Sequence, residues 1–325
     1  MSIVERITKN ITKYIIGHRE LIKLMNIAIL SGGHILLEGP SGTGKTTIAN
    51  FFAQSIGGTF RRIQMVPDLL PSDIIGTTYF DMSISKWRLK KGPIFSNVLL
   101  IDEINRAPPR TQAAFIEAMQ EHRVTIENET LDLPIPFLVL ATQYASQTQF
   151  GIEGTYQLTP VQIDRFAYSY PIDFPNEEEE IEIISKIDNI EIAKIDPVVS
   201  PEEIYNEQKR ITNIYVSKEI KEYIVNIVNF IRKQKEILLP PSPRASIWLF
   251  KGSRVLAYME GKDYVIPDYV KYLAKYVLLH RIRIKPEYEI EGIKAIDIIN
   301  RALEYVEVPK AFVLSKNSSK TKIGI

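Results

Sequence analysis

The eight residues Gly39-Pro40-Ser41-Gly42-Thr43-Gly44-Lys45-Thr46 fit the pattern G-x-x-x-x-G-K-[ST] of a phosphate-binding loop at every fixed position. An aliphatic run, His34 to Leu37, precedes them and a helical pattern, Thr46 to Ile56, follows, so the loop lies between a strand and a helix as the motif requires. Glycines let successive backbone N–H groups point at phosphates, and the helix N-terminus adds its positive end. We therefore expect ATP and Mg²⁺ as cofactors, with Lys45 on the β/γ-phosphate oxygens and Thr46 on the metal.

Two carboxylates follow a second aliphatic run, Val98 to Ile101. A buried strand that ends in Asp102 and Glu103 has the form called Walker B, in which the first carboxylate completes the Mg²⁺ coordination and the second takes a proton from the attacking water. A strand-end pair that only caps the next helix is the alternative. Because a phosphate loop needs such a partner, we assign Asp102 to the metal and Glu103 to general-base catalysis.

Composition limits the classes of protein that fit. A chain of 325 residues predicts two domains, and 45% hydrophobic with 24% charged residues excludes disorder as the main state. The formal net charge of +1 gives no global basic field of the kind that drives non-specific nucleic-acid binding. Because the chain has no cysteine, disulfides, cysteine-bound zinc, iron–sulfur clusters and thiol nucleophiles are excluded.

The first half of the chain alternates strand and helix patterns. A third strand candidate is Phe137 to Ala141, a helix is expected at Pro109 to Glu121, and Val124 to Leu133 has the pattern of a hairpin. Alternation of this kind is typical of a mostly parallel sheet with helices on its faces. The sequence therefore predicts an α/β nucleotide-binding domain over residues 1–175.

Helical patterns follow one another after Phe174-Pro175. Ser200 begins a capping box, and two further helices are expected over 245–260 and 267–279. We expect residues 176–314 to form an all-helical domain and residues 315–325 a flexible tail.

No targeting or membrane segment stands out. The first residues, MSIVERITKN, interleave charged and apolar side chains, unlike the apolar core of a signal peptide. The aliphatic runs elsewhere fall far short of the about 20 residues that a membrane span requires. We therefore expect a cytoplasmic protein with no membrane partner.

Further motifs extend the first two over most of the chain. In chain order they are Pro71-Ser72-Asp73-Ile74-Ile75-Gly76-Thr77, Gly92-Pro93-Ile94-Phe95, Ile104-Asn105-Arg106-Ala107-Pro108-Pro109, Gly154-Thr155-Tyr156, Asp164-Arg165-Phe166 and Ser242-Pro243-Arg244-Ala245. Together with the phosphate loop they resemble the MoxR family of AAA+ ATPases, which belongs to the clade with a helix-2 insert. The resemblance covers roughly residues 15–285 and implies an AAA+ domain with a parallel sheet, followed by a helical lid.

The resemblance assigns roles to two arginines. Arg165 corresponds to the arginine finger, which reaches the γ-phosphate in a neighbouring subunit, and Arg244 to sensor 2, which touches the nucleotide of its own subunit. Considered without the family, each arginine is better explained as a surface ion pair. The resemblance also implies a homo-oligomeric ring, expected to have six subunits, and a chaperone-like action on a protein client, in this family often one with a von Willebrand factor A domain.

The expected nucleotide site consists of the loop and its neighbours. Its cofactor-binding residues are Gly39, Pro40, Ser41, Gly42, Thr43, Gly44, Lys45, Thr46 and Thr47. Gly17-His18 lies where the family has a Gly-Gln near the adenine, so by resemblance His18 borders the base; a surface or core histidine is the alternative. The four histidines show no i, i+3 or i, i+4 spacing, so we expect no histidine metal site.

One position departs from the family's pattern. The family usually reads Ala-Thr-Gln-Asn after its third strand, and this asparagine, sensor 1, orients the attacking water; the chain reads Ala141-Thr142-Gln143-Tyr144. A tyrosine offers no amide, so we expect Gln143 or Thr142 to substitute, or hydrolysis to be slow. A slowly hydrolysing, nucleotide-dependent scaffold is therefore one alternative function.

Residues Tyr79 to Lys91 resemble the helix-2 insert, and Val124 to Leu133 the hairpin before sensor 1, both of which face the pore of the family's rings. Trp87 lies among Lys86, Arg88, Lys90 and Lys91, a pattern that suits either a protein client or stacking on single-stranded nucleic acid. A nucleic-acid motor is the other alternative function, and the near-zero net charge argues against it.

Overall fold

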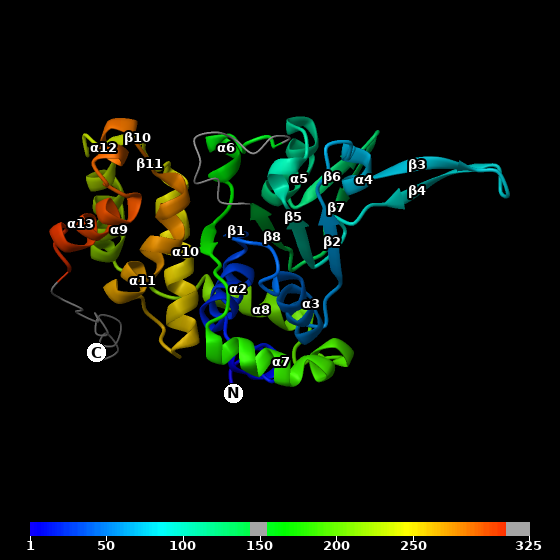
Figure 1. The fold of residues 1–325 in the computed structure, drawn as a ribbon, viewed down its shortest axis with the longest axis horizontal. Helices are drawn as coiled ribbons and strands as arrows, with labels where there is room; N and C mark the ends of the chain where they lie inside the picture. Colours follow the sequence, from blue (N-terminus) through cyan, green and yellow to red (C-terminus); the bar gives the residue numbers. More distant parts are fainter. Residues whose placement is uncertain (144–154, 310–325) are drawn as a thin grey trace, which may run out of the picture.

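The computed structural model describes residues 1–143 and 155–309 of the chain. Figure 1 shows an α/β body, a helical lid beside it and a long two-stranded ribbon that projects from the body on the side away from the lid. Three of the expected strands, two of the expected body helices and the expected hairpin are all present. Residue Tyr144 and the tail from 315 lie outside the described residues.

A five-stranded parallel sheet forms the centre of the body, in the order β2-β5-β8-β1-β9. Its strands are β1 (Ile35–Glu38), β2 (Phe60–Gln64), β5 (Val98–Asp102), β8 (Leu138–Gln143) and β9 (Tyr168–Pro171). The three central strands are almost wholly buried aliphatic runs, because helices cover both faces of the sheet. The expectation of a parallel α/β sheet is confirmed.

Helices cover this sheet on both sides. One face packs against α1 (Ile3–Ile11), α2 (Arg19–Ser31) and α3 (Lys45–Ser55), and the other against α4 (Pro71–Ile75), the 3-10 helix η1 (Ile104–Arg106) and α5 (Pro109–Glu121). Successive residues of β5 enter different cores, because side chains alternate along a strand: Leu100 lies in the cluster of α3, and Leu99 and Ile101 in the cluster of α5.

The lid is helical, as expected, with one addition. Its helices are α9 (Lys218–Arg232), α10 (Pro243–Met259), α11 (Pro267–Leu278), the 3-10 helix η2 (Leu279–Arg281), α12 (Pro286–Ile290) and α13 (Ala295–Tyr305). Two short strands, β10 (Ile237–Leu239) and β11 (Arg283–Ile284), pair in an antiparallel sheet that the helical expectation did not include. The lid shares one continuous apolar core with the α1–α3 face of the body.

Two helices of the second half lie against the body (Figure 1). They are α7 (Glu177–Ile192) and α8 (Pro201–Ile211), which follow α6 (Pro160–Ile163) and β9 in the chain. Arg6 of α1 pairs with Glu203 at 3.0 Å, and the Gln208 amide donates to the Ile29 carbonyl at 2.6 Å. Residues 193–211 thus contribute to the surface of the body as well as leading to the lid.

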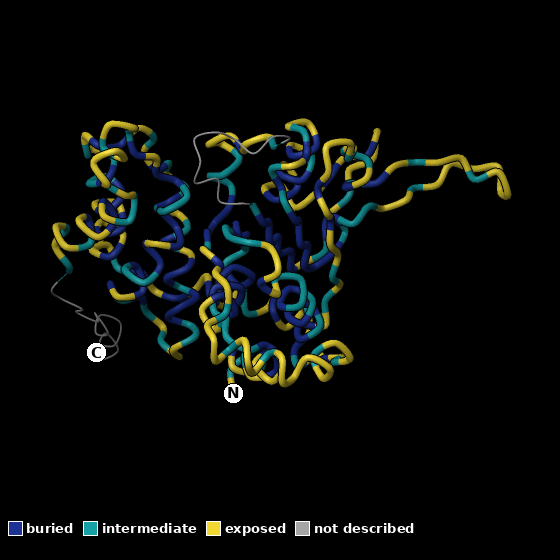
Figure 2. Tube along the Cα trace, viewed as in Figure 1, coloured by how far each residue is buried: buried dark blue, intermediate teal, exposed yellow. Residues whose placement is uncertain are grey.

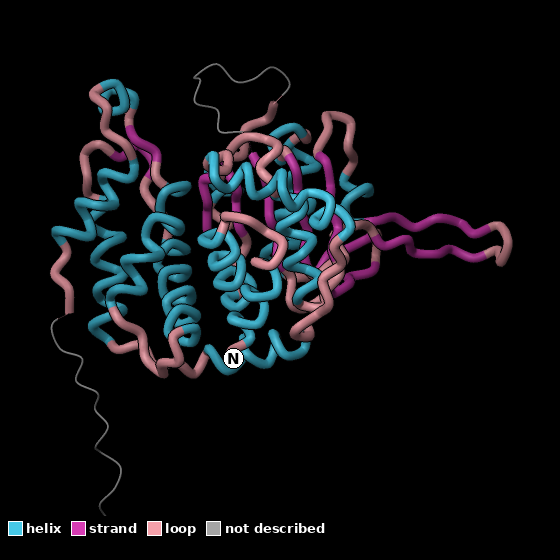
Figure 3. The backbone as a smooth tube through the Cα atoms, turned by 60° about the horizontal axis from the view of Figure 1, so that its bottom comes forward, coloured by secondary structure: helices cyan, strands magenta, loops and turns pink. Residues whose placement is uncertain are grey.

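Two hairpins leave the body on the side opposite the lid. The longer ribbon pairs β3 (Gly76–Asp81) with β4 (Lys86–Lys91), and the shorter pairs β6 (Arg123–Ile126) with β7 (Glu129–Asp132). Figures 2 and 3 show that the long ribbon is mostly exposed and stands clear of the body in two views. At its base, a side chain on Gly76 would lie 2.3 Å from the Lys90 carbonyl, so only glycine fits there.

Side chains on the two faces of this ribbon differ, because cross-strand partners share a face. Phe80 faces Trp87, with ring centroids 5.6 Å apart, and Thr78 faces Leu89 on the same side. The opposite face presents Lys86, Arg88 and Lys90 with their partners Asp81, Tyr79 and Thr77. The ribbon therefore has one aromatic face and one cationic face.

Candidate nucleotide site

A pocket of about 300 Å³ lies where the parallel strands β1, β5 and β8 end. It is lined by Gly39, Ser41, Gly42, Thr43, Gly44, Lys45, Thr46, Thr47, Arg62, Gln64, Asp102, Glu103, Thr142 and Gln143. Ligands of open parallel sheets bind at the carboxyl ends of the strands, and all but two of these residues were expected from the sequence motifs. The pocket therefore joins the phosphate loop to the Walker B carboxylates.

The loop has the conformation that phosphate binding needs. Gly42 and Gly44 adopt positive φ angles of 82° and 77°, and a side chain on Gly39 would lie 2.0 Å from the Ile172 carbonyl. Gly44 precedes α3 without a side-chain cap, so the first N–H groups of that helix are left for a ligand. Burial lowers the pKa of Lys45, and Asp102 and Glu103 oppose this shift. Its ammonium group is bound to the Pro40 carbonyl and lies 3.2 Å from the Thr43 hydroxyl, so the lysine folds back on the loop.

The Walker B carboxylates are held by their neighbours. The Arg62 Nε lies 2.6 Å from Asp102 Oδ2, and the Thr142 hydroxyl lies 3.4 Å from the other oxygen of Asp102. Glu103 has a left-handed backbone, with φ 55°, and its N–H donates to the Thr142 hydroxyl at 2.8 Å. The Thr142 hydroxyl thus contacts both residues that the metal and the attacking water would need.

The side chain of Glu103 is also held, in this case by two donors. Gln64 Nε2 donates to its Oε2 at 2.9 Å, and Arg106 Nε lies 3.0 Å from the same oxygen. Sequence reasoning missed Gln64 and Arg62 because the strand FRRIQ is short and polar. Alternation along this stretch was the available signal, since Ile63 turns to the core and the residues on either side of it turn together to the other face.

Gln143 has a different partner from the one expected of sensor 1. Its amide donates to Glu38 Oε1 at 2.6 Å, and burial raises the pKa of Glu38 while this hydrogen bond opposes the shift. Gln143 lines the pocket but its amide is engaged, so Thr142 is the better substitute for the missing asparagine. Tyr144, the departure itself, lies outside the described residues.

His18 lies next to the loop rather than among the lining residues of this pocket. It precedes α2 with φ 50°, and a hydrogen bond with the Thr43 backbone connects it to the loop. Burial lowers the pKa of His18, an effect that Glu179 of α7 opposes and Lys45 reinforces. The position is compatible with a place beside the base.

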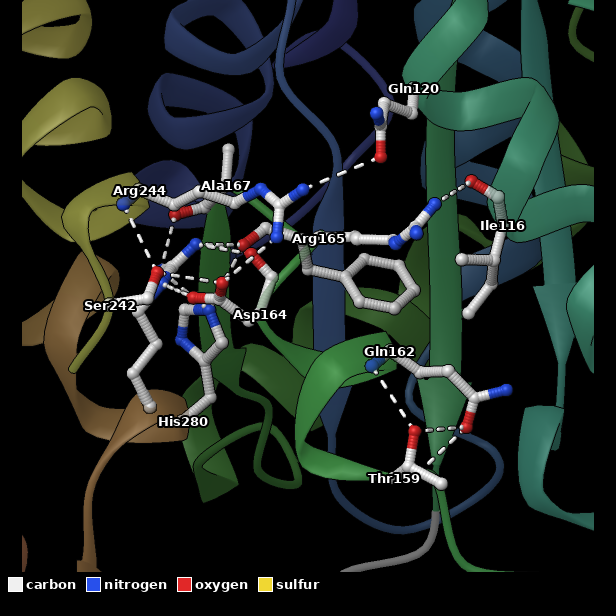
Figure 4. Close-up of polar contacts among 12 residues, drawn as sticks. Ile116, Gln120, Thr159, Gln162, Asp164, Arg165, Ala167, Ser242, Arg244 and His280 are labelled. Carbon is white, nitrogen blue, oxygen red and sulfur yellow. Dashed lines mark hydrogen bonds and ion pairs between the residues drawn. The ribbon is translucent and has the colours of Figure 1, made fainter. Parts of the chain in front are cut away.

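The two arginines lie at the opposite edge of the sheet, where the strands begin. The Ala167 N–H, just before β9, donates to the His34 carbonyl, just before β1, and the segment with Arg165 leads into this contact. Arg165 Nη1 lies 3.4 Å from the Ile116 carbonyl, and Arg244 Nη1 lies 3.2 Å from Asp164 Oδ2 (Figure 4). Arg244, which the resemblance assigns to the nucleotide of its own subunit, is paired here with Asp164 before β9 and is not among the residues that line the pocket.

Comparisons with known proteins agree with this geometry. The ATPase family associated with various cellular activities (AAA) matches residues 34–168, and the AAA lid domain matches residues 230–302. Chaperone MoxR1 of Mycobacterium tuberculosis is 36% identical, over 94% of this chain and 82% of that protein. The chain belongs to the MoxR family of AAA+ ATPases. Bacillus subtilis YeaC is 39% identical over 93% of both chains, and the crystal structure of a candidate ATPase from Cytophaga hutchinsonii is 35% identical, with a TM-score of 0.88 over 95% of both chains.

In this MoxR-family chain a buried arginine joins the lid to the segment that carries Arg165. Arg281 of η2 is 1% exposed, and its Nε lies 2.9 Å from Asp164 Oδ1. Its other nitrogens donate to the carbonyls of Asp164, Phe166 and Ala167, and to Val277 within the lid. Burial lowers the pKa of Arg281 to about 10, and Asp164 opposes the shift. No sequence motif indicated this contact.

No helix in residues 1–143 and 155–309 has both the length and the apolar character needed to cross a bilayer. The same residues contain no group of three or more His, Asp or Glu side chains arranged to hold a metal. His34 is buried and His280 is half-buried, and both make hydrogen bonds to backbone groups, so both have structural roles.

The residues of the pocket fit a magnesium nucleotide. The N–H groups at the start of α3 and the open space beside Gly42 and Gly44, where no atom lies within 4 Å of an added Cβ, suit phosphate oxygens. The hydroxyl of Thr46 and the carboxylate of Asp102 are oxygen donors, which Mg²⁺ prefers, and both line the same pocket.

Proposed function

We propose that this chain binds Mg·ATP, hydrolyses it in a ring of identical subunits and uses the cycle to remodel or activate a partner protein. The observation that carries the proposal is the convergence of the phosphate loop, Asp102 and Glu103 on one pocket. Membership of the AAA family supports it.

Each residue of the pocket has a separate role in the proposed in-line hydrolysis. Lys45 and the N–H groups of the loop hold the phosphates, Thr46 and Asp102 hold the metal, and Glu103 accepts the proton of the attacking water. When bound, Mg²⁺ would neutralise negative charge on the phosphates. Gln64 and Arg106 both bind Oε2 of Glu103 and so orient the carboxylate that would take this proton.

The further positive charges for the terminal phosphate come from a neighbouring subunit. Arg165 and Arg244 lie at the sheet edge opposite the pocket, so neither reaches the nucleotide of its own chain. When chains stack so that the end of the sheet with Arg165 and Arg244 meets the pocket of the next chain, both arginines reach the terminal phosphate there. An arginine supplied by a neighbouring subunit increases the rate of hydrolysis by about 10³- to 10⁵-fold. We propose a closed ring of six subunits, as the family resemblance implies, because head-to-tail contacts close into a ring when the rotation between subunits permits it.

The projecting ribbon is the proposed contact with a protein client. Trp87 is 71% exposed and packs edge to face with Phe80, so one face of the ribbon presents an open aromatic surface. By resemblance to the family, the client carries a von Willebrand factor A domain, and the complex works in the cytoplasm.

A nucleic-acid motor is the second candidate, and the cationic face of the ribbon favours it. Lys86, Arg88 and Lys90 on one side and an aromatic pair on the other are the elements with which proteins hold single strands. The third candidate is a slowly hydrolysing, nucleotide-dependent scaffold. It is favoured by the contacts that hold the Glu103 carboxylate to Gln64 and Arg106.

The deciding experiment is the steady-state ATPase rate against protein concentration, with mass measured in the same samples, with and without single-stranded DNA. A rate per subunit that rises as rings form and ignores DNA supports the remodelling ATPase, and Lys45→Ala serves as the inactive control. Stimulation by DNA that weakens with salt favours the motor. Assembled rings with a negligible rate favour the scaffold.

A further inference from the structure

Arg62 is a cation of the nucleotide pocket that neither nucleotide motif includes. It belongs to β2, the edge strand next to β5, and lines the pocket together with Lys45 and Thr46. Among the described residues that line this pocket, Lys45 and Arg62 are the only ones with positive charge. The question is what a second cation does there.

The position of Arg62 is fixed by strand pairing. Gln64 of β2 is the register partner of Asp102 in β5, and Ile63 turns to the core under α5, so Arg62 turns to the face covered by α3. Its Nε lies 2.6 Å from Asp102 Oδ2, and its Nη2 lies 3.2 Å from the Gln64 side-chain oxygen. The side chain is still 48% exposed, so much of the guanidinium faces the pocket.

Two polar side chains at the end of β8 that could contact the terminal phosphate already have partners within the chain. The Gln143 amide is bound to Glu38, and the Thr142 hydroxyl is engaged by the Glu103 N–H and Asp102. Lys45 reaches the phosphates from the loop side. Arg62 approaches from the other side of the pocket, next to the carboxylate that the metal needs.

The charges of the pocket change when a magnesium nucleotide enters. Asp102 then shares its charge with the metal, so its hold on Arg62 weakens, while the terminal phosphate brings new negative charge into the pocket. A guanidinium matches phosphate oxygens with two parallel hydrogen bonds and remains charged throughout. A diphosphate offers no such group at that position.

We propose that Arg62 is a ligand of the terminal phosphate, supplied by the chain that holds the phosphate loop, and that it makes the pocket favour a nucleoside triphosphate over a diphosphate. The inference rests on the proposed function, because it assumes that the pocket takes Mg·ATP. Arg62 of β2 would thus distinguish ATP from ADP without a contribution from a neighbouring subunit.

The test measures nucleotide affinity rather than turnover. The full chain carries Arg165→Ala and Arg244→Ala, so that the arginines of the other sheet edge contribute nothing. Calorimetry at saturating Mg²⁺ gives Kd for ADP and for an ATP analogue with an uncleavable β–γ imido bridge. Adding Arg62→Gln is expected to weaken the analogue by about 10- to 100-fold, the range of a charge-assisted hydrogen bond, and ADP by less than about threefold.

Two variants control for the loss of charge. Arg61→Gln removes the same charge one residue earlier, on the other face of β2, and is expected to leave both affinities unchanged. Arg62→Lys keeps the charge without the planar fork and is expected to recover part of the lost preference.

The outcomes separate this inference from the proposed function. Equal weakening of both nucleotides by Arg62→Gln overturns the inference, because Arg62 then only positions Asp102, and so does an unchanged ratio of the two affinities. If the parent chain with intact Arg62 binds neither nucleotide, the proposed function fails instead. A selective loss of the analogue, spared in Arg61→Gln, supports the inference.

Discussion

The two ends of the strands in the central sheet carry different parts of the proposed catalytic set. The edge where the strands end carries the phosphate loop and the Walker B carboxylates, and the edge where they begin carries Arg165 and Arg244. The phosphate loop and the Walker B carboxylates belong to short contiguous motifs that directly follow strands. Arg165 and Arg244 belong to segments far apart in the chain that meet where the lid contacts the body. Under the proposed function, one chain binds the nucleotide and two chains are needed to complete a site.

The strongest test of this division mixes two inactive variants. Lys45→Ala damages only the pocket edge, and Arg165→Ala only the arginine edge, so each alone is expected to lose nearly all turnover. In mixed rings about a quarter of the interfaces pair an intact pocket with an intact arginine, and activity returns in proportion. The ATPase rate of equimolar mixtures checks this, and mixtures no more active than the separate variants would contradict an arginine supplied in trans.

A second prediction concerns chemistry within the pocket edge. Glu103→Gln keeps the hydrogen-bonding shape but removes the base, so turnover is expected to fall by about 10²- to 10⁴-fold while the nucleotide affinity stays the same. Single-turnover kinetics and calorimetry on the same samples measure the two quantities. Near-normal turnover in this variant would remove Glu103 from the mechanism.

A third prediction concerns stability at the arginine edge. Asp164→Asn leaves Arg281 buried without its charge partner, so the free energy of unfolding is expected to fall by about 3 to 5 kcal/mol. The Kd of nucleotide for the unassembled chain is expected to stay the same, because Asp164 lies at the far edge. Urea denaturation and calorimetry measure both, and Asp81→Asn, which breaks the exposed pair with Arg88 on the ribbon, is the matched control with little expected change.

The smallest predicted effect is a pH dependence centred on His34. Burial lowers the pKa of His34 to about 4, from an ordinary value of 6.5, so the ring is neutral in the folded chain. Its contribution to stability is therefore complete above pH 6.5 and is lost as the pH falls to about 4, by about 3 kcal/mol in total.

The neutral ring accepts a hydrogen bond from the Val139 N–H at 3.1 Å and donates to the Met119 carbonyl at 3.0 Å. His34→Gln can make both bonds without titrating, so its unfolding free energy should depend less on pH in this window. Urea denaturation at a series of pH values compares the two chains, and equal slopes would show that His34 does not carry the effect.

The sequence predicted the pocket edge better than the arginine edge, for a physical reason. The phosphate loop and Asp102 each follow an aliphatic strand directly, so local pattern and function coincide. Alternation around Ile63 places Arg62 on the other face of its strand, but only the pairing of β2 with β5 brings it to Asp102. Asp164 and Arg281 are separated by 117 residues, and their contact exists only because η2 packs against the start of β9.

The resemblance gave Arg165 and Arg244 their candidate roles but not their location relative to each other. Both lie beside Asp164 because α10 begins at Pro243, directly after Ser242, whose hydroxyl donates to the Asp164 carboxylate at 2.7 Å. The spacing of motifs along the sequence does not indicate that the start of α10 contacts the segment before β9. The long-range packing therefore had to come from the structure.

The projecting ribbon has a mechanical consequence. Each strand of six residues spans about 20 Å, so a rotation of about 10° at the ribbon's base moves its tip by about 3 to 4 Å. That base is connected through α4 to β2, the strand whose side chains hold both Walker B carboxylates. A small movement of β2 that reached the base of the ribbon would therefore be enlarged at the end of the ribbon where Trp87 lies.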